Sequence, residues 1–75
     1  MASVNARFGR TVRALRSEAG YSQESFADAI GVHRTYMGTL ERGDGNPTLD
    51  MIVRVAKGLR LSLSELFEAV EKETG

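Results

Sequence analysis

Cysteine and tryptophan are absent from the 75-residue sequence, and histidine and proline occur once each. Without cysteine the chain has no disulfide, no thiolate zinc site and no cysteine nucleophile, and it fits a reducing compartment. The one histidine, His33, has no second histidine with which to hold a metal and no partners for a Ser-His-Asp triad. We therefore expect no metal, no cofactor and no catalytic residue.

Long apolar segments are also absent. No run approaches the roughly 18 residues of a membrane-spanning helix, and the N-terminus lacks the apolar core of a signal peptide. Hydrophobic residues make up 41% and charged residues 27% of the chain, a balance typical of globular rather than disordered domains. We predict a single domain over residues 1–75, in a cytoplasmic protein that does not associate with membranes.

The chain also lacks net charge, because ten basic residues balance ten acidic ones. This argues mildly against a nucleic-acid partner, since Lys and Arg supply most of the non-specific affinity for phosphates. The charge is nevertheless polarised. Residues 1–42 carry six arginines and four acidic residues, whereas residues 43–75 carry four basic and six acidic residues. The acidic end would repel a polyanion, so we expect it to face away from any DNA.

What the sequence does contain is helical periodicity in five segments joined by short connections, with no strand-like alternation and no repeat. The first segment covers about residues 6–19 and the third about residues 33–42. The second, fourth and fifth begin after Ser22, Thr48 and Ser62, whose side chains are suited to cap helix N-termini. We predict an all-α fold of five helices.

The second and third segments form a helix-turn-helix pattern. A helix of about eight residues, a turn at Gly31 and a helix of about ten residues are short enough to fit a DNA major groove roughly 12 Å wide. Helical angles place Met37 and Leu40 in the interior and leave one polar face free for a partner. That face comprises Arg34, Thr35, Gly38, Thr39 and Arg42.

Residues 22–43, SQESFADAIGVHRTYMGTLERG, resemble the Cro and phage-repressor (XRE-type) family of helix-turn-helix DNA-binding proteins. The resemblance includes LRSEAGYSQ before this segment, ERGDGNPTL after it and LSLSELF near the end, so it covers nearly the whole chain. It implies a compact five-helix, lambda-repressor-like DNA-binding domain with the motif in helices two and three. The strings FGRT, HRTY and ERGD are also similar to the controller proteins of restriction-modification systems, which are homodimeric regulators.

The resemblance assigns base-reading roles to the third helix. Arg34 and Thr35 fall at the family's principal base-reading positions, and arginine can bond guanine O6 and N7 together, worth about 1–3 kcal/mol of discrimination. Tyr36 and Thr39 are expected to contact base edges or the backbone, with half-buried packing as the alternative for Tyr36. The predicted base contacts are Arg34, Thr35, Tyr36 and Thr39.

A second group of residues is expected to bind the DNA backbone. Gln23 stands at the start of the second helix, where the family's glutamine binds a phosphate and where free N–H groups attract anions. The alternative is an ordinary polar residue of the first turn. His33 is expected to cap the third helix or to lie beside a phosphate. The predicted backbone contacts are Gln23, His33, Arg42, Asn46 and Thr48.

Three further features bear on the fold. The resemblance implies a salt bridge between Arg16 and Glu41, which would join the first and third helices. Position 60 is arginine where relatives often have the glycine that ends the fourth helix, so we expect Gly58 to provide the break instead. Gly38 costs about 1 kcal/mol relative to Ala inside a helix, which indicates either close approach to a groove wall or tight helix packing.

The predicted fifth helix, about residues 62–73, favours a dimer. One recognition helix reads few base pairs, so specific binding generally needs two half-sites about 34 Å apart. This helix has more large apolar side chains than a short chain needs internally, although all of them could belong to the core. The predicted interface residues are Leu61, Leu63, Leu66, Phe67 and Val70.

These observations favour a transcriptional regulator that binds a palindromic operator as a homodimer, in its narrower form the controller of a restriction-modification system. Its partners would be double-stranded DNA and a second copy, and no segment beyond the fifth helix remains to bind a small molecule. An antitoxin-like or other protein-interaction module, with secondary DNA binding, is the alternative. An enzyme is disfavoured, because the carboxylates are scattered and no glycine-rich phosphate loop follows a strand.

Overall fold

The secondary structure is entirely helical in the described part of the chain. A computed structural model describes residues 3–73, where five α-helices are joined by short connections and no strand occurs. The all-α prediction is confirmed, and residues 1–2 and 74–75 of the predicted domain lie outside the described residues. In chain order the helices are α1 (Val4–Glu18), α2 (Gln23–Ile30), α3 (Arg34–Glu41), α4 (Leu49–Gly58) and α5 (Leu63–Lys72).

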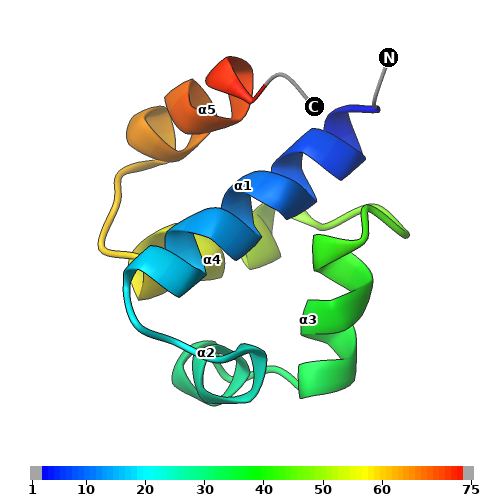
Figure 1. Ribbon diagram of the computed structural model, residues 1–75, viewed down its shortest axis with the longest axis vertical. Helices are drawn as coiled ribbons and strands as arrows, with labels where there is room; N and C mark the ends of the chain where they lie inside the picture. Colours follow the sequence, from blue (N-terminus) through cyan, green and yellow to red (C-terminus); the bar gives the residue numbers. More distant parts are fainter. Residues whose placement is uncertain (1–2, 74–75) are drawn as a thin grey trace.

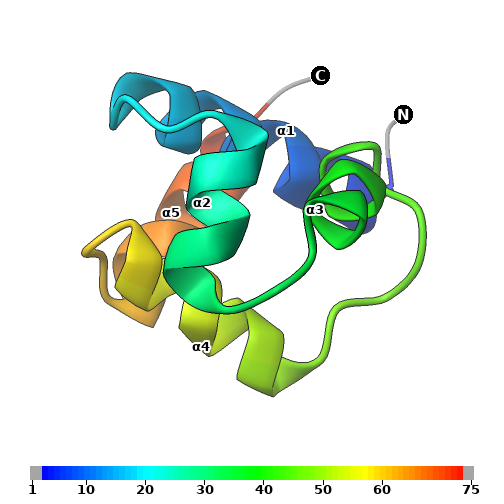
Figure 2. The same cartoon turned by 90° about the horizontal axis from the view of Figure 1, so that it is seen from below.

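The other four helices are arranged around α1. Figure 1 shows α1 crossing the middle of the molecule, with α5 on one side, α2 and α3 on the other and α4 behind it. Figure 2 shows α2 and α3 as neighbours connected by a short turn. Helix α1 packs on α3 and α5, while α4 packs on α2 and α5. None of the helices in residues 3–73 has the length and apolar character needed to cross a membrane.

A single apolar core joins all five helices. Every helix contributes at least one fully buried side chain, so no helix is held by its hydrogen bonds alone. Burial of each such side chain stabilises the fold by roughly 1.5–3 kcal/mol. The largest of them are Val12 on α1, Phe26 on α2, Met37 on α3, Val55 on α4, and Leu66 and Val70 on α5.

Polar side chains cap the helix N-termini. Ser22 and Ser62 form capping boxes with the residues three positions later, and the Thr48 hydroxyl accepts a hydrogen bond from the first turn of α4 at 3.1 Å. The N-caps predicted at these three positions are confirmed. His33 caps α3, because its Nδ1 accepts a hydrogen bond from the N–H of Thr35 at 3.0 Å. Such caps typically contribute about 1 kcal/mol each.

The end of α4 contradicts the expectation drawn from position 60. Arg60 itself adopts the left-handed conformation, with a φ of 60°. Within residues 3–73 it is the one non-glycine residue with a positive φ. Gly58 does not break the helix but belongs to its last turn. A Cβ on Gly58 would lie 2.5 Å from Cγ2 of Ile30 and 3.0 Å from Cε1 of Phe26. Gly58 therefore serves close packing between α4 and α2.

Replacement of Arg60 by glycine should stabilise the protein. The left-handed conformation costs a non-glycine residue roughly 1–2 kcal/mol, part of which is offset by the greater chain entropy of unfolded glycine. We expect Arg60→Gly to raise the free energy of unfolding by about 1 kcal/mol in urea denaturation. Gly58→Ala should lower it, because Ile30 and Phe26 leave no room for a methyl group. Equal or lower stability of Arg60→Gly would contradict this account.

Candidate nucleic-acid interface

Helices α2 and α3 meet at a tight turn centred on Gly31. Gly31 has a φ of 77°, which favours glycine, and the N–H of Val32 donates to the carbonyl of Ala27 at 2.9 Å. Phe26 and Met37 are both fully buried on either side of this turn. The turn and the two anchoring side chains together hold α3 at a defined angle to α2.

A buried ion pair joins α1 to the end of α3. Arg16 donates from Nε and Nη2 to the two carboxylate oxygens of Glu41 at 2.6 and 3.0 Å, and both residues are buried. Arg16 also donates from Nη1 to the carbonyl of Tyr21, just before α2, at 2.8 Å. Hydrogen bonding to Glu41 and the charge of that carboxylate raise the pKa of Arg16 above its ordinary value. The salt bridge that the resemblance implied is confirmed.

Gln23 is bound to the same carboxylate. Its Nε2 donates to Oε1 of Glu41 at 2.9 Å, so the amide at the start of α2 is held in one orientation. One N–H of the amide is used in this bond, which leaves the second N–H and the carbonyl oxygen for other partners. Gln23 is thus more than an ordinary polar residue of the first turn, and its contact with a DNA phosphate stays a prediction.

The N-terminal end of α3 is exposed to solvent. His33, Arg34 and Thr35 are all exposed. Nη1 of Arg34 lies 3.9 Å from Oε2 of Glu24 on α2, and 67% and 68% of these side chains are exposed. An exposed ion pair of this kind contributes roughly 0–1 kcal/mol, so a guanine could displace Glu24 at little cost. The Arg34 guanidinium is therefore available to a partner.

Tyr36 and Thr39 are less accessible than the start of the helix, and both are partly buried. Tyr36 packs against the apolar core, which is the alternative that its position in the sequence left open. The hydroxyl of Thr39 donates to the carbonyl of Thr35, one turn earlier, at 3.1 Å. Both side chains have structural roles, and only part of each remains for the predicted contacts with bases.

Gly38 makes room for two polar side chains. A Cβ at this position would lie 3.2 Å from Nη1 of Arg42 and 3.8 Å from Oε1 of Gln23. The closest groups are the ends of side chains rather than the backbone of a neighbouring helix, so tight helix packing does not account for Gly38, and close approach to a groove wall stays a prediction. Nε of Arg42 also donates to Asp44 at 3.2 Å. Because position 38 has no side chain, the side chains of Gln23 and Arg42 can both lie beside it on α3. Both residues are predicted to contact the DNA backbone.

The α3–α4 connection, residues 42–48, extends this polar surface. Asn46 and Thr48 are exposed, and the Thr48 hydroxyl is the N-cap of α4. Oδ1 of Asn46 accepts a hydrogen bond from Nδ2 of Asn5 at 2.6 Å, and the same Nδ2 donates to the carbonyl of Gly45 at 3.1 Å. The role of Asn5 could not be predicted from the sequence, because a bond between positions 41 residues apart leaves no local signal.

The predicted dimer residues divide between the core and the surface. Leu66 and Val70 are 0% and 2% exposed within one chain, so their assignment to a dimer interface was wrong. They form the part of the apolar stripe of α5 that packs inward, and a partner cannot reach a side chain that its own chain already covers. Leu61 is partly buried against the core. Leu63 and Phe67 remain 43% and 39% exposed.

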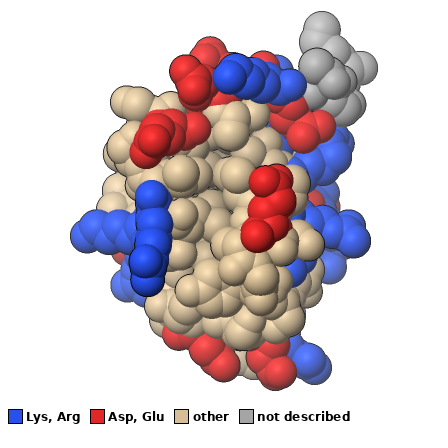
Figure 3. Space-filling model, turned by 60° about the vertical axis from the view of Figure 1, so that its left-hand side comes forward, with Lys and Arg blue, Asp and Glu red and all other residues tan. Residues whose placement is uncertain are grey.

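An apolar groove lies beside Phe67. It has a volume of about 200 Å³, and Val4, Ile52 and Phe67 are among the residues that line it. Val4 is 60% exposed. On the side where α5 and the α4–α5 connection are turned forward, Figure 3 shows uncharged side chains predominating across the middle of the surface. We call Val4, Ile52, Leu63 and Phe67 the apolar face.

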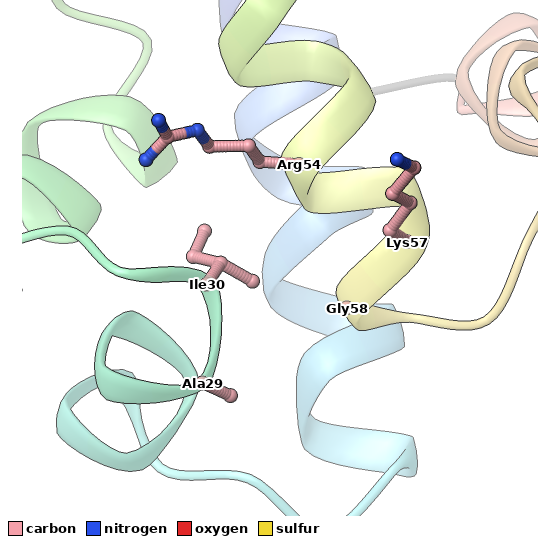
Figure 4. A pocket seen from close by; sticks show the side chains of 5 residues that line it. All are labelled: Ala29, Ile30, Arg54, Lys57 and Gly58. Atoms are coloured by element: carbon pink, nitrogen blue, oxygen red, sulfur yellow. The ribbon is translucent and has the colours of Figure 1, made fainter.

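A second hollow, of about 290 Å³, lies between the end of α2 and α4. Figure 4 shows Arg54 extending toward the α2–α3 turn, while Lys57 stands further along α4. Nε of Arg54 already pairs with Asp50 at 3.3 Å. The other lining residues are Ala29, Ile30 and Gly58, so the hollow brings together no acid and base for catalysis.

Comparison with known proteins finds relatives across nearly the whole chain. A family model described as a helix-turn-helix domain matches residues 7–69. Control protein C.MunI of Mycoplasma sp is 42% identical over 74 residues, covering 97% of this chain and 100% of that protein. The crystal structure of the restriction-modification controller protein C.AhdI from Aeromonas hydrophila matches with a TM-score of 0.79 and 40% identity, covering 83% of this chain and 94% of that one.

A further solved structure contains nucleic acid. It is the tetramer of the restriction-modification controller protein C.Esp1396I in complex with its natural 35 base-pair operator. It matches with a TM-score of 0.87 and 29% identity, covering 97% of this chain and 96% of that one. This likeness extends to the arrangement of the helices over almost all of the chain.

The pairing of Arg16 with Glu41 can be measured with a double-mutant cycle. Removal of one partner leaves a buried charge without compensation, so Arg16→Ala and Glu41→Ala should each lower the free energy of unfolding by about 3–5 kcal/mol. The double variant should lose less than the sum, with a coupling energy of about 1–3 kcal/mol in urea denaturation. A coupling energy near zero would show that the two side chains act independently.

Proposed function

The chain belongs to the helix-turn-helix domain family, and on that basis we propose that it is a sequence-specific DNA-binding regulator of transcription. The observation that carries the proposal is the exposed first turn of α3, with Arg34 and Thr35, on a helix anchored by the buried pair of Arg16 and Glu41. A helix held this way can enter a major groove without rearrangement of the domain. The relatives described above are control proteins rather than enzymes.

In this proposal Arg34 and Thr35 read base edges. Arginine presents two donors in a fork that matches guanine O6 and N7, and the threonine methyl group can contact a thymine methyl. Tyr36 and Thr39, being partly buried, contribute at the margin of the contact.

The backbone contacts would surround the base-reading residues. Gln23 and His33 stand at the N-termini of α2 and α3, where free N–H groups and the helix dipole attract phosphate. Arg42 adds a positive charge, and Asn46 and Thr48 lie in and at the end of the α3–α4 connection. Contacts on both sides of α3 would set its register in the groove.

A homodimer is the second part of the proposal. The apolar face exposes large side chains that water solvates poorly, and a symmetric contact between two copies would bury each of them. Leu63 and Phe67 form its centre on α5, in place of the buried Leu66 and Val70. Two recognition helices related by a two-fold axis would read a palindromic operator.

The narrower proposal is that the chain controls a restriction-modification system. Its support is the similarity to three proteins. C.AhdI and C.Esp1396I are named restriction-modification controller proteins, and C.MunI is named a control protein. A cytoplasmic location belongs to the same proposal, because a regulator has to reach the operator that it binds. The whole chain would then serve as one DNA-binding domain.

Selection of bound sequences from a random DNA pool tests the reading of bases. The wild-type protein should enrich a site with two-fold symmetry. Arg34→Ala should enrich the same site with a relaxed preference at one guanine in each half-site, where the loss of a bidentate contact costs about 1–3 kcal/mol. Recovery of no enriched motif by the wild-type protein would overturn the proposed function.

Analytical ultracentrifugation tests the dimer. Leu63→Gln should weaken self-association by at least about tenfold, because a two-fold interface contains the substituted position twice and each leucine buries apolar surface. Ser64→Gln is the matched control, since Ser64 is exposed on the same helix outside the apolar stripe. A wild-type protein that stays monomeric at every concentration would contradict the dimer.

A further inference from the structure

The first turn of α1 is tied to the α3–α4 connection by one side chain, that of Asn5. Nδ2 of Asn5 donates to the carbonyl of Gly45 at 3.1 Å and to Oδ1 of Asn46 at 2.6 Å. Figures 1 and 2 both show the start of α1 beside this connection. Asn5 is only partly exposed, whereas Asn46 is exposed. Both residues also line the apolar groove beside Phe67, so the contact lies between that groove and the surface proposed to bind DNA.

The chemistry of the three groups leaves only one orientation for the two amides. The carbonyl of Gly45 can accept but not donate, so Asn5 must direct its NH₂ group and not its oxygen toward the connection. That NH₂ group in turn requires an acceptor from Asn46, which has to present Oδ1. The NH₂ group of Asn46 is consequently kept away from Asn5 as a pair of donors.

The Asn46 amide can present opposite faces to an anion. With its NH₂ group outward it donates to a phosphate oxygen, whereas with Oδ1 outward it repels one. In a free asparagine the two orientations interchange by rotation about one bond, and half of the possible encounters are then unproductive. The hydrogen bond from Asn5 removes the unproductive orientation before DNA arrives.

From this geometry we propose that Asn5 is a positioning residue for DNA binding, which acts through Asn46 by directing the Asn46 NH₂ group to a backbone phosphate. The inference rests on the proposed function, since it concerns a contact with the operator. Asn5 itself need not touch DNA. Its neighbour along α1, Ala6, packs against Gly43, where a Cβ would lie 2.7 Å from Cα of Ala6. Backbone packing thus holds α1 against the connection independently of the Asn5 side chain.

The experiment measures operator affinity in a double-mutant cycle between Asn5→Ala and Asn46→Ala. Asn46→Ala should weaken binding by about three- to tenfold, which corresponds to the loss of one hydrogen bond, whereas Asn5→Ala, which leaves the Asn46 amide free to take either orientation, should weaken it by about twofold. Because Asn5 acts through Asn46, the double variant should bind no more weakly than Asn46→Ala alone. Equal weakening by Asn5→Ala in both backgrounds would overturn the proposal, since Asn5 would then act by another route.

An operator with one uncharged methylphosphonate at each backbone position in turn gives a readout that a merely structural role would not change. Wild-type protein should lose affinity at one position in each half-site to which Asn46→Ala is insensitive, and Asn5→Ala should show a reduced loss at that same position. If Asn5→Ala retains the wild-type sensitivity at the position that Asn46→Ala has lost, the proposal fails. The melting temperatures of the variants, measured alongside, identify any change in affinity that comes from unfolding.

Asn5→Asp reverses the hydrogen-bonding character of the side chain. A carboxylate can only accept, so Asn46 should rotate its NH₂ group inward and direct Oδ1 toward the phosphate. We expect a larger loss of affinity than for Asn5→Ala. Ser3→Asp is the matched control, because it adds the same charge at the same end of α1 and aspartate also caps helices. Equal losses for the two aspartate variants would mean that charge alone is responsible, against the proposal.

The outcomes separate this inference from the proposed function. If the wild-type protein binds no selected operator, the proposed function itself fails. If it binds and the cycle is additive, only the role of Asn5 fails.

Discussion

The buried ion pair between Arg16 and Glu41 is the interaction on which the rest of the structure depends. Two charges removed from water are costly unless their hydrogen bonds are satisfied, and here each is supplied with further partners. Arg16 also bonds the carbonyl of Tyr21, and Glu41 also accepts from Gln23. The pair therefore connects α1, the turn before α2, the start of α2 and the end of α3. Those are the elements that orient the exposed start of α3.

Close backbone packing makes this ion pair possible. A Cβ on Gly9 of α1 would lie 2.5 Å from the carbonyl oxygen of Leu40 and 2.6 Å from that of Glu41. Only glycine allows α1 to approach the end of α3 so closely, and the short distance lets Arg16 reach the carboxylate. At the beginning of α1 the backbone of Ala6 packs closely in the same way, because a Cβ on Gly43 would lie 2.7 Å from Cα of Ala6. Helix α1 thus acts as the support against which the recognition helix is set.

The sequence predicted most of the fold because its signals are local. Helix periodicity and the caps at Ser22, Thr48 and Ser62 depend on residues within one or two turns, so they can be recognised without a structure. The ion pair spans 25 positions and was predicted only through the family resemblance. Position 60 was predicted wrongly, because packing of Gly58 on α2 keeps α4 helical to that point and leaves the left-handed turn to Arg60.

The amino-acid sequence by itself determined the five helices, the starts of α2, α4 and α5 and the polar character of the face around Arg34, since each follows from short-range spacing and hydrogen bonding. Only the tertiary structure decided which apolar side chains of α5 face inward, because the stripe that carries Leu66 also carries Phe67. It alone brought Asn5 to Asn46, 41 positions away. Contacts of this kind depend on how whole helices pack, and no local pattern in the chain records that packing.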